Sequence, residues 1–176
     1  LVGVIDADVG LQGSDLRAAE RTFQVVRQVA GRAGRAEKPG VALIQTHQPE
    51  HPVIKAIISG DEAGFWNAES ASRQLAGAPP FVRLASIVIS ALTADEALRV
   101  GTRLAQNIGP LVKIGAKMYG PAVAPVPRIR GRFRVRLLIK AKKSAPLQKA
   151  IKQWLLPLKL PPELKLSVDI DPQSFL

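Results

Sequence analysis

The chain has 176 residues, 47% of them hydrophobic, and a formal net charge of +11. This composition is too apolar for a disordered chain and supplies a core for one or two small domains, and no apolar run of about 18 or more residues predicts a membrane span. Cysteine is absent, which excludes disulfides and thiolate metal sites.

The charge is unevenly distributed along the chain. Residues 1–62 hold 7 Lys and Arg against 8 Asp and Glu, whereas residues 63–176 hold 18 against 6. We therefore expect a near-neutral enzyme part, followed by a part whose positive surface binds a polyanion such as nucleic acid. The chain begins at Leu1 inside a predicted strand, from which we expect further sequence to precede it.

The first elements predict a strand–helix–strand unit. Residues 1–5 form an apolar run typical of a buried parallel strand, and Asp6 and Asp8 follow at its carboxyl end, where α/β sheets place their ligands. The residues leave open whether these aspartates touch a nucleotide or only shape loops. A loop at 9–13 separates the strand from an amphipathic helix over about 15–32, and a second strand is predicted over 41–46.

The end of this helix carries an octet suited to phosphate, Gln28-Val29-Ala30-Gly31-Arg32-Ala33-Gly34-Arg35. Arginine stays charged and offers a planar fork of donors that matches phosphate oxygens, and the small residues between leave room for close approach. Cations at a helix C-terminus can also serve only to complement the helix dipole. The octet resembles motif VI of superfamily-2 helicases, which implies that Arg32 and Arg35 are catalytic and that Gln28 and Gly31 belong to the same ATP site.

Two helices, over 49–59 and 61–75, form a predicted connector that ends at Pro79 and Pro80. The elements expected after it are a strand over 81–90, a helix to about 107, strands over about 116–124 and 129–141, a helix over 146–156 and a strand over 165–170. This order, β-α-β-β-α-β, is ferredoxin-like. The predicted division is therefore a RecA-like lobe end at 1–48, a connector at 49–78 and a basic domain at 79–176.

The fourth of these later elements carries a second chemical signal. From 128 to 142 the odd positions are mostly apolar, and the even positions are mostly cations, so period two predicts one core face and one basic face. A charged face on a sheet is often only solvated, but residues 128–143 contain eight cations and no acid, which favours nucleic-acid contact through phosphate. The predicted contact residues are Arg128, Arg130, Arg132, Arg134, Arg136, Lys140 and Lys142.

Three further side chains could contact partners or bases. Lys143 and Gln148, near the start of the last predicted helix, are candidates for binding an acidic peptide tail. Phe133 and Trp154 are expected in the core, because one falls on the apolar strand face and the other on a helix. Tyr119 stays open as a stacking platform.

Both signals together resemble the primosomal protein N-prime (PriA) family, the bacterial replication-restart helicases of superfamily 2. The resemblance covers nearly the whole chain. Besides the octet it rests on Asp6-Ala7-Asp8, Asp15-Leu16-Arg17-Ala18-Ala19-Glu20-Arg21, Pro39-Gly40, Ile44-Gln45-Thr46, Pro79-Pro80-Phe81, Gly120-Pro121-Ala122, Arg130-Gly131-Arg132-Phe133-Arg134 and Val168-Asp169-Ile170-Asp171-Pro172.

The resemblance implies an ATP- and Mg²⁺-dependent 3′-5′ DNA helicase that recognises stalled forks in the bacterial cytoplasm, at the nucleoid. It also implies forked and single-stranded DNA, single-stranded DNA-binding protein, primosome proteins and the replicative helicase as partners. Gln12-Gly13-Ser14, Glu62 and Ala78 depart from the family pattern without touching the arginines.

Parts of such an enzyme are missing from this chain. It contains no phosphate loop of the G-x-x-x-x-G-K-[ST] type and no DEAD or DEAH motif, and the zinc-binding cysteines of the family belong to a segment upstream. We therefore expect no ATPase activity from these 176 residues alone. The alternative is a non-enzymatic nucleic-acid-binding protein whose octet is vestigial.

Overall fold

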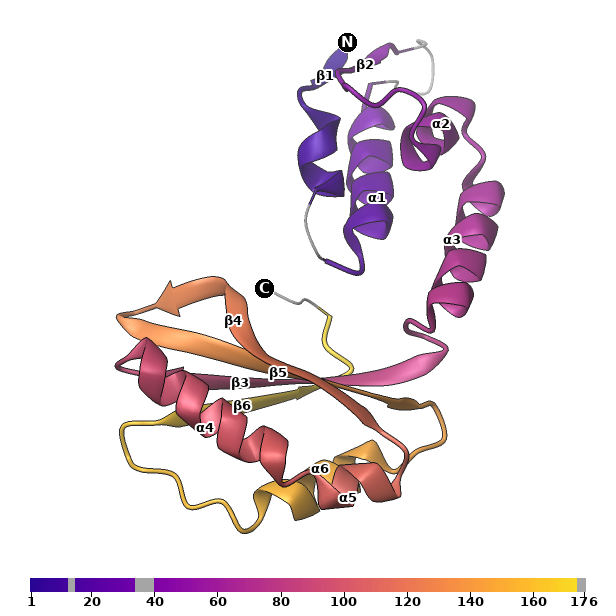
Figure 1. Ribbon diagram of the computed structural model, residues 1–176. Coiled ribbons are helices and arrows are strands. Elements are labelled where there is room, and N and C mark those ends of the chain that lie inside the picture. The colour runs from indigo at the N-terminus through magenta and orange to yellow at the C-terminus, as the bar shows by residue number, and fades with distance from the viewer. Residues whose placement is uncertain (13–14, 34–39, 174–176) are drawn as a thin grey trace. The chain divides into compact units, whose positions relative to one another are not determined.

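The computed structural model describes residues 1–12, 15–33 and 40–173. The chain divides into two compact units, Leu1–Leu75 and Ala76–Leu176 (Figure 1). Both units combine helices with strands, so the protein is of mixed α/β class. In the part of the chain that is described, no helix is both long and apolar enough to cross a membrane.

Unit 1 contains a short parallel sheet and a group of helices. Strand β1 (Val2–Val4) pairs with β2 (Ala42–Ile44), and Val2 lies opposite Ala42. A 3-10 helix, η1, lies where a loop was predicted, and it begins after Asp6, whose backbone is left-handed at φ 52. The helices of this unit are η1 (Ala7–Leu11), α1 (Ala18–Ala30), α2 (Pro52–Ser59) and α3 (Glu62–Ala76).

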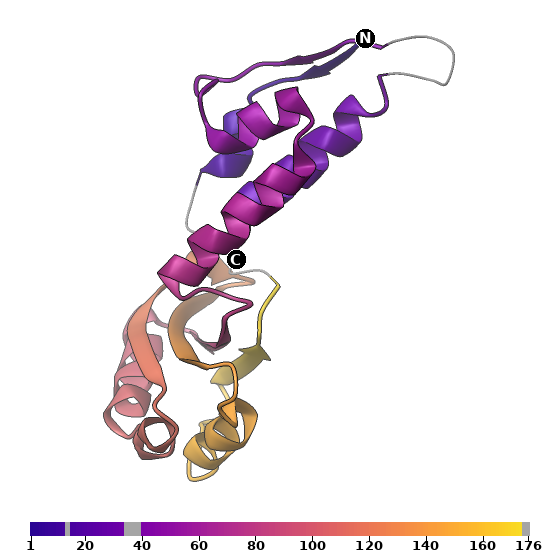
Figure 2. The same cartoon turned by 90° about the vertical axis from the view of Figure 1, so that its right-hand side faces the viewer.

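Helices α1 and α3 lie side by side and run in opposite directions (Figure 2). Phe23 stacks on Phe65 with ring centroids 4.0 Å apart, and Trp66 meets both rings edge-on. At one end Arg73 pairs with Glu20 at 3.0 Å, and at the other end Arg27 pairs with Glu62. The apolar face predicted for α1 is confirmed at Phe23 and Val26, which are buried, whereas Leu16 is exposed.

Unit 2 is built on one antiparallel sheet with the strand order β4-β5-β3-β6. Three helices cover one face of this sheet and leave the other face without helices (Figure 1). Its elements are β3 (Val82–Ala91), α4 (Ala94–Gln106), α5 (Gly109–Lys113), β4 (Lys117–Ile129), β5 (Arg132–Lys142), α6 (Leu147–Leu155) and β6 (Lys165–Ile170). The short helix α5 was not predicted.

The core of unit 2 lies between the sheet and its helices. Alternate residues of the two central strands supply it, because successive side chains of a strand point to opposite faces. From β5 these are Val135, Leu137, Ile139 and Ala141, and from β3 they are Ala85, Ile87, Ile89 and Ala91. Trp154 of α6 packs into the same core, as predicted.

The edge strand β4 is longer than predicted, and the boundary with β5 is different. The sequence predicted one strand over 129–141, but Ile129 ends β4 and β5 begins at Arg132. Arg130, at φ 49, and Gly131, at φ 76, form the turn between β4 and β5. Positive φ at both central residues is typical of a tight two-residue hairpin turn.

Candidate nucleic-acid interface and phosphate-binding helix

The uncovered face of the sheet in unit 2 carries a row of cations on β5. Arg134, Arg136 and Lys140 alternate with buried core residues, so their side chains lie on the face opposite the helices. All three side chains are half-buried. This part of the predicted basic face is confirmed as a structural feature.

Two other strands of the sheet, β4 and β6, add cations to the same face. Residues directly opposite each other in an antiparallel pair share a face. Lys117 of β4 lies opposite Lys140, and Lys165 of β6 lies opposite Ser90, which in turn lies opposite Arg134. We name the set Lys117, Arg134, Arg136, Lys140 and Lys165 the basic sheet face.

Lys117 and Lys165 were not predicted from the sequence, because strand pairing is needed to place them on this face. Tyr119 lies opposite Leu138 on this face and is 49% exposed. One acid, Asp169, also falls here, opposite Ser86.

The electrostatics of this face favour an anionic ligand. Burial, and secondarily the like charge of Arg134, lower the pKa of Arg136. The Arg136 guanidinium still keeps its proton at neutral pH, because the ordinary pKa of arginine lies far above it. Two like charges held together in partial burial cost free energy that an anion between them would offset.

Two of the predicted contact residues do not belong to this face. Arg130 lies in the turn, and Arg128 belongs to β4, opposite Phe133. Arg128 therefore shares the face of Phe133, which is the side of the helices, and its guanidinium carbon lies 5.0 Å from the Phe133 ring centroid. The expectation of one continuous row from Arg128 to Lys142 is wrong, because the turn at 130–131 interrupts it.

The end of β5 leads to the residues predicted to bind a peptide partner. Lys142 is the last residue of β5, Lys143 follows it, and both are exposed. Gln148 lies in the first turn of α6 and is exposed as well. Lys142 and Lys143, which precede α6 in the sequence, and Gln148, in its first turn, are thus all exposed to solvent.

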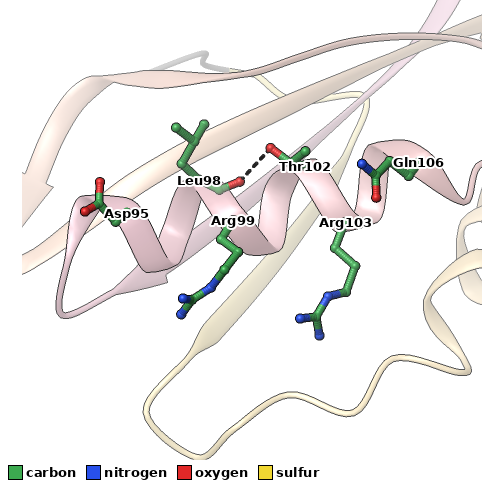
Figure 3. A pocket seen from close by; sticks show the side chains of 6 residues that line it. All are labelled: Asp95, Leu98, Arg99, Thr102, Arg103 and Gln106. Atoms are coloured by element: carbon green, nitrogen blue, oxygen red, sulfur yellow. Dashed lines mark hydrogen bonds between the residues drawn. The ribbon is translucent and has the colours of Figure 1, made fainter.

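A hollow runs along the exposed side of α4 (Figure 3). It is lined by Asp95, Leu98, Arg99, Thr102, Arg103 and Gln106. Arg99 and Arg103 project from the same side of the helix, as their spacing of four residues requires. That spacing is visible in the sequence, but the sequence analysis did not use it.

In unit 1 the predicted phosphate-binding residues lie at the end of α1. Gln28 is exposed in its last turn, and the helix ends at Ala30. Gly31 and Arg32 follow and are exposed, with the Arg32 N–H donating to the Val29 carbonyl at 3.1 Å. Gly34 and Arg35 lie outside the described residues. Exposed amide and guanidinium donors of this kind fit an anionic phosphate oxygen.

Asp8 has a structural position in unit 1. It is 2% exposed, and its carboxylate accepts hydrogen bonds from the Thr46 hydroxyl and from the His47 N–H, both at 2.6 Å. The hydrogen bond from Thr46, followed by that from His47, lowers the pKa of Asp8. Asp8 therefore holds η1 to the end of β2 instead of facing a ligand.

Comparison with known proteins shows to which family the chain belongs. A family model described as the primosomal protein N C-terminal domain matches residues 74–173, which is more than half of the chain. The chain belongs to the PriA family. The family resemblance inferred from the sequence is thereby confirmed.

Relatives in distant bacteria match the chain from end to end. It is 41% identical over 175 residues to the replication restart protein PriA of Rickettsia conorii, 36% over 179 residues to that of Bacillus subtilis and 35% over 176 residues to that of Treponema pallidum. These matches cover 99%, 100% and 100% of this chain, but 26%, 22% and 27% of the three PriA proteins. The chain thus spans about a quarter of the length of these relatives.

Proposed function

We propose that the chain is the C-terminal part of an ATP-dependent 3′-5′ DNA helicase that recognises stalled forks and restarts replication by primosome assembly. Within it, unit 2 binds forked and single-stranded DNA. The observation that carries this proposal is the basic sheet face, with cations from three of the four strands on a face that the helices leave open. Membership in a family of replication restart proteins makes DNA the polyanion to expect.

The chemistry of the basic sheet face suits a phosphate backbone. Its groups are Lys and Arg side chains, which contact phosphate regardless of base sequence and so position DNA without specifying it. Each phosphate that they neutralise releases counterions, so the affinity should fall steeply with salt. Tyr119 offers an exposed ring among these cations, on which an unpaired base can stack.

The architecture of each unit supports the same proposal. In unit 2 the order β3-α4-β4-β5-α6-β6, with α5 inserted, and the antiparallel arrangement β4-β5-β3-β6 suit a ferredoxin-like domain. In unit 1 the parallel pair β1 and β2, joined through α1, suits the closing part of a RecA-like lobe. The proposed boundaries are the predicted ones: lobe end at 1–48, connector at 49–78 and basic domain at 79–176.

The proposed ATP site is shared with the part of the protein outside this chain. Arg32 and Arg35 would stabilise charge on the γ-phosphate, with Gln28 and Gly31 beside them, while Mg²⁺ and the phosphate loop would come from elsewhere. The exposure of Gln28 and Arg32 at the end of α1 supports this. Zinc, expected in the family, would be held outside this chain as well.

The proposed partners are single-stranded DNA-binding protein, the primosome proteins and the replicative helicase. Lys143 and Gln148, both exposed near the start of α6, would receive an acidic peptide tail of the first of these. The site of action is the cytoplasm, at the nucleoid.

The DNA-binding proposal is tested by the salt dependence of binding. The chain is titrated with a fluorescently labelled forked DNA at several salt concentrations. Replacing Arg134 and Arg136 by Ser should reduce the log–log slope by roughly one unit for each phosphate contact that is lost.

The matched control is the double variant Lys149→Ser and Lys152→Ser, which removes the same charge from exposed positions on α6. A slope that falls equally in the control and the test variant would indicate a general charge effect and contradict the assignment. Circular dichroism checks that each variant is folded.

A further inference from the structure

The tip of the β4–β5 hairpin presents cations on both of its faces. Ile129 lies opposite Arg132, and Arg128 lies opposite Phe133, on either side of the turn at 130–131. Directly opposite residues share a face, so Arg128 is on the side of the helices and Arg132 is on the side of the basic sheet face. The pairing of β3 with β5 ends at Ala91 opposite Phe133, so the tip beyond this point consists of two strands alone.

The arginines of the tip are held by other contacts, and among the described residues no acid forms an ion pair with them. Between Lys117 and Lys143 the sequence contains no Asp or Glu. Arg128 lies over the Phe133 ring, and Arg134 donates to the Val126 carbonyl at 3.3 Å. The Nε and Nη2 atoms of Arg132 are shielded from solvent, with no hydrogen-bond partner among the described residues.

Unpaired, shielded donors of a charged group are costly, and phosphate oxygens would satisfy them once the Arg132 side chain turns toward solvent. The Arg128 guanidinium is meanwhile held over the Phe133 ring on the opposite face. Both faces of the tip are therefore prepared for anions.

We propose that this tip enters a groove of duplex DNA, with Arg128 contacting one phosphate backbone and Arg132 contacting the other. The inference rests on the proposed DNA binding and adds which part of a fork the tip contacts, namely a double-stranded arm. The major groove of B-form DNA is about 12 Å wide and admits a two-stranded ribbon, and its two walls are phosphate backbones. A single strand has one backbone, so it would use the cations of one face only.

The test compares a blunt DNA duplex with one of its strands, using the whole chain and its Arg128→Ser and Arg132→Ser variants. Each variant should weaken duplex binding roughly tenfold, the loss expected for one charged hydrogen-bonded contact, whereas at most one of the two should weaken binding of the single strand. Arg128→Lys keeps the charge, so it should retain the salt slope of the original protein. The control is Lys113→Ser, at the end of α5, which precedes β4 and so lies at the opposite end of that strand from the tip.

Each outcome of this binding test decides one part of the proposal. If one of the two serine variants is without effect on the duplex, the two-backbone contact is wrong. If both weaken the single strand as much as the duplex, the tip is a single-strand contact. A duplex RNA of the same sequence should show no dependence on either arginine, because the major groove of A-form RNA is too narrow, and an equal dependence would overturn groove entry. If the unaltered chain binds none of these nucleic acids, the proposed function itself fails.

Discussion

Asp8 and Thr46 are joined by a 2.6 Å hydrogen bond between a carboxylate after β1 and a hydroxyl after β2. The same carboxylate accepts from the backbone of His47. Asn at this position has one acceptor oxygen where Asp has two, so Asp8→Asn leaves one of these donors without its acceptor. We expect the variant to lower the denaturant midpoint of unit 1 at pH 7 and to speed amide hydrogen exchange over residues 42–48.

The effect of Asp8→Asn should depend on pH. The pKa of Asp8 is lowered in the folded state, so the folded chain binds fewer protons than the unfolded chain, and stability rises with pH through this range. The contribution is complete above the unfolded pKa of about 4 and is lost as the pH falls through the lowered folded pKa. The difference between the original protein and the variant should therefore shrink from pH 7 toward pH 3.

Arg73 connects α3 to two carboxylates. It pairs with Glu20 at 3.0 Å and with Glu69 at 2.7 Å, and all three side chains are less than a quarter exposed. Burial alone would lower the pKa of Arg73, but the two carboxylates together raise it. Arg73→Met leaves two partly buried carboxylates without their cation and should lower the free energy of unfolding by about 1–3 kcal/mol.

This loss is measured by urea denaturation in a Trp154→Phe background, in which the fluorescence of Trp66 reports unit 1. Lys55→Met is the matched control, because Lys55 and its partner Glu50 are both more than half exposed. Such a surface pair contributes less than about 1 kcal/mol. Equal losses in the two variants would contradict the structural role of Arg73.

Two glycines of the β4–β5 ribbon should differ in their tolerance of a side chain. Both have positive φ, 96 at Gly120 and 76 at Gly131. A Cβ on Gly120 would lie 2.7 Å from the Arg136 carbonyl oxygen, whereas a Cβ on Gly131 would meet open space. Gly131→Ala should cost about 1–2 kcal/mol for its left-handed backbone, and Gly120→Ala should cost more because a clash is added.

The glycine pair is compared by the fluorescence of Trp154 during urea denaturation, in a Trp66→Phe background. The critical result is which of the two variants has the lower free energy of unfolding. A Gly131→Ala variant less stable than Gly120→Ala would contradict the close approach of β4 to β5 at Gly120.

The proposed phosphate site makes a prediction about turnover. These 176 residues lack a phosphate loop, so the purified chain should hydrolyse no ATP. In the whole protein, replacing Arg32 or Arg35 by Ala should lower the ATPase rate on the order of a thousandfold, the usual loss when an arginine finger is removed. Arg27→Ala is the control, since Arg27 pairs with Glu62 on another side of α1. Normal hydrolysis by both Arg32 and Arg35 variants would favour a binding protein with a vestigial octet.

Local pattern in the sequence predicted most of the elements. The alternation of apolar and charged residues along β5 predicted its core face, because strand geometry fixes which neighbours share a side. The helices α1, α4 and α6 followed from apolar spacing. The boundary between β4 and β5 did not follow, because Ile129-Arg130-Gly131-Arg132 continues the same alternation, and an arginine at positive φ is an uncommon turn residue.

The sequence by itself therefore determined the family, the charge asymmetry and the candidates for phosphate contact, since these depend on residue type and on spacing along one element. Only the tertiary structure decided which cations lie on the same face of the sheet. Lys117 and Lys165 reach the basic sheet face, and Arg128 leaves it, through strand pairing between distant segments. Asp8 became a structural residue because its donors come from 38 and 39 residues away. Contacts of this kind join residues that are distant in the sequence, and the local periodicity of residue types does not determine which distant segments pair.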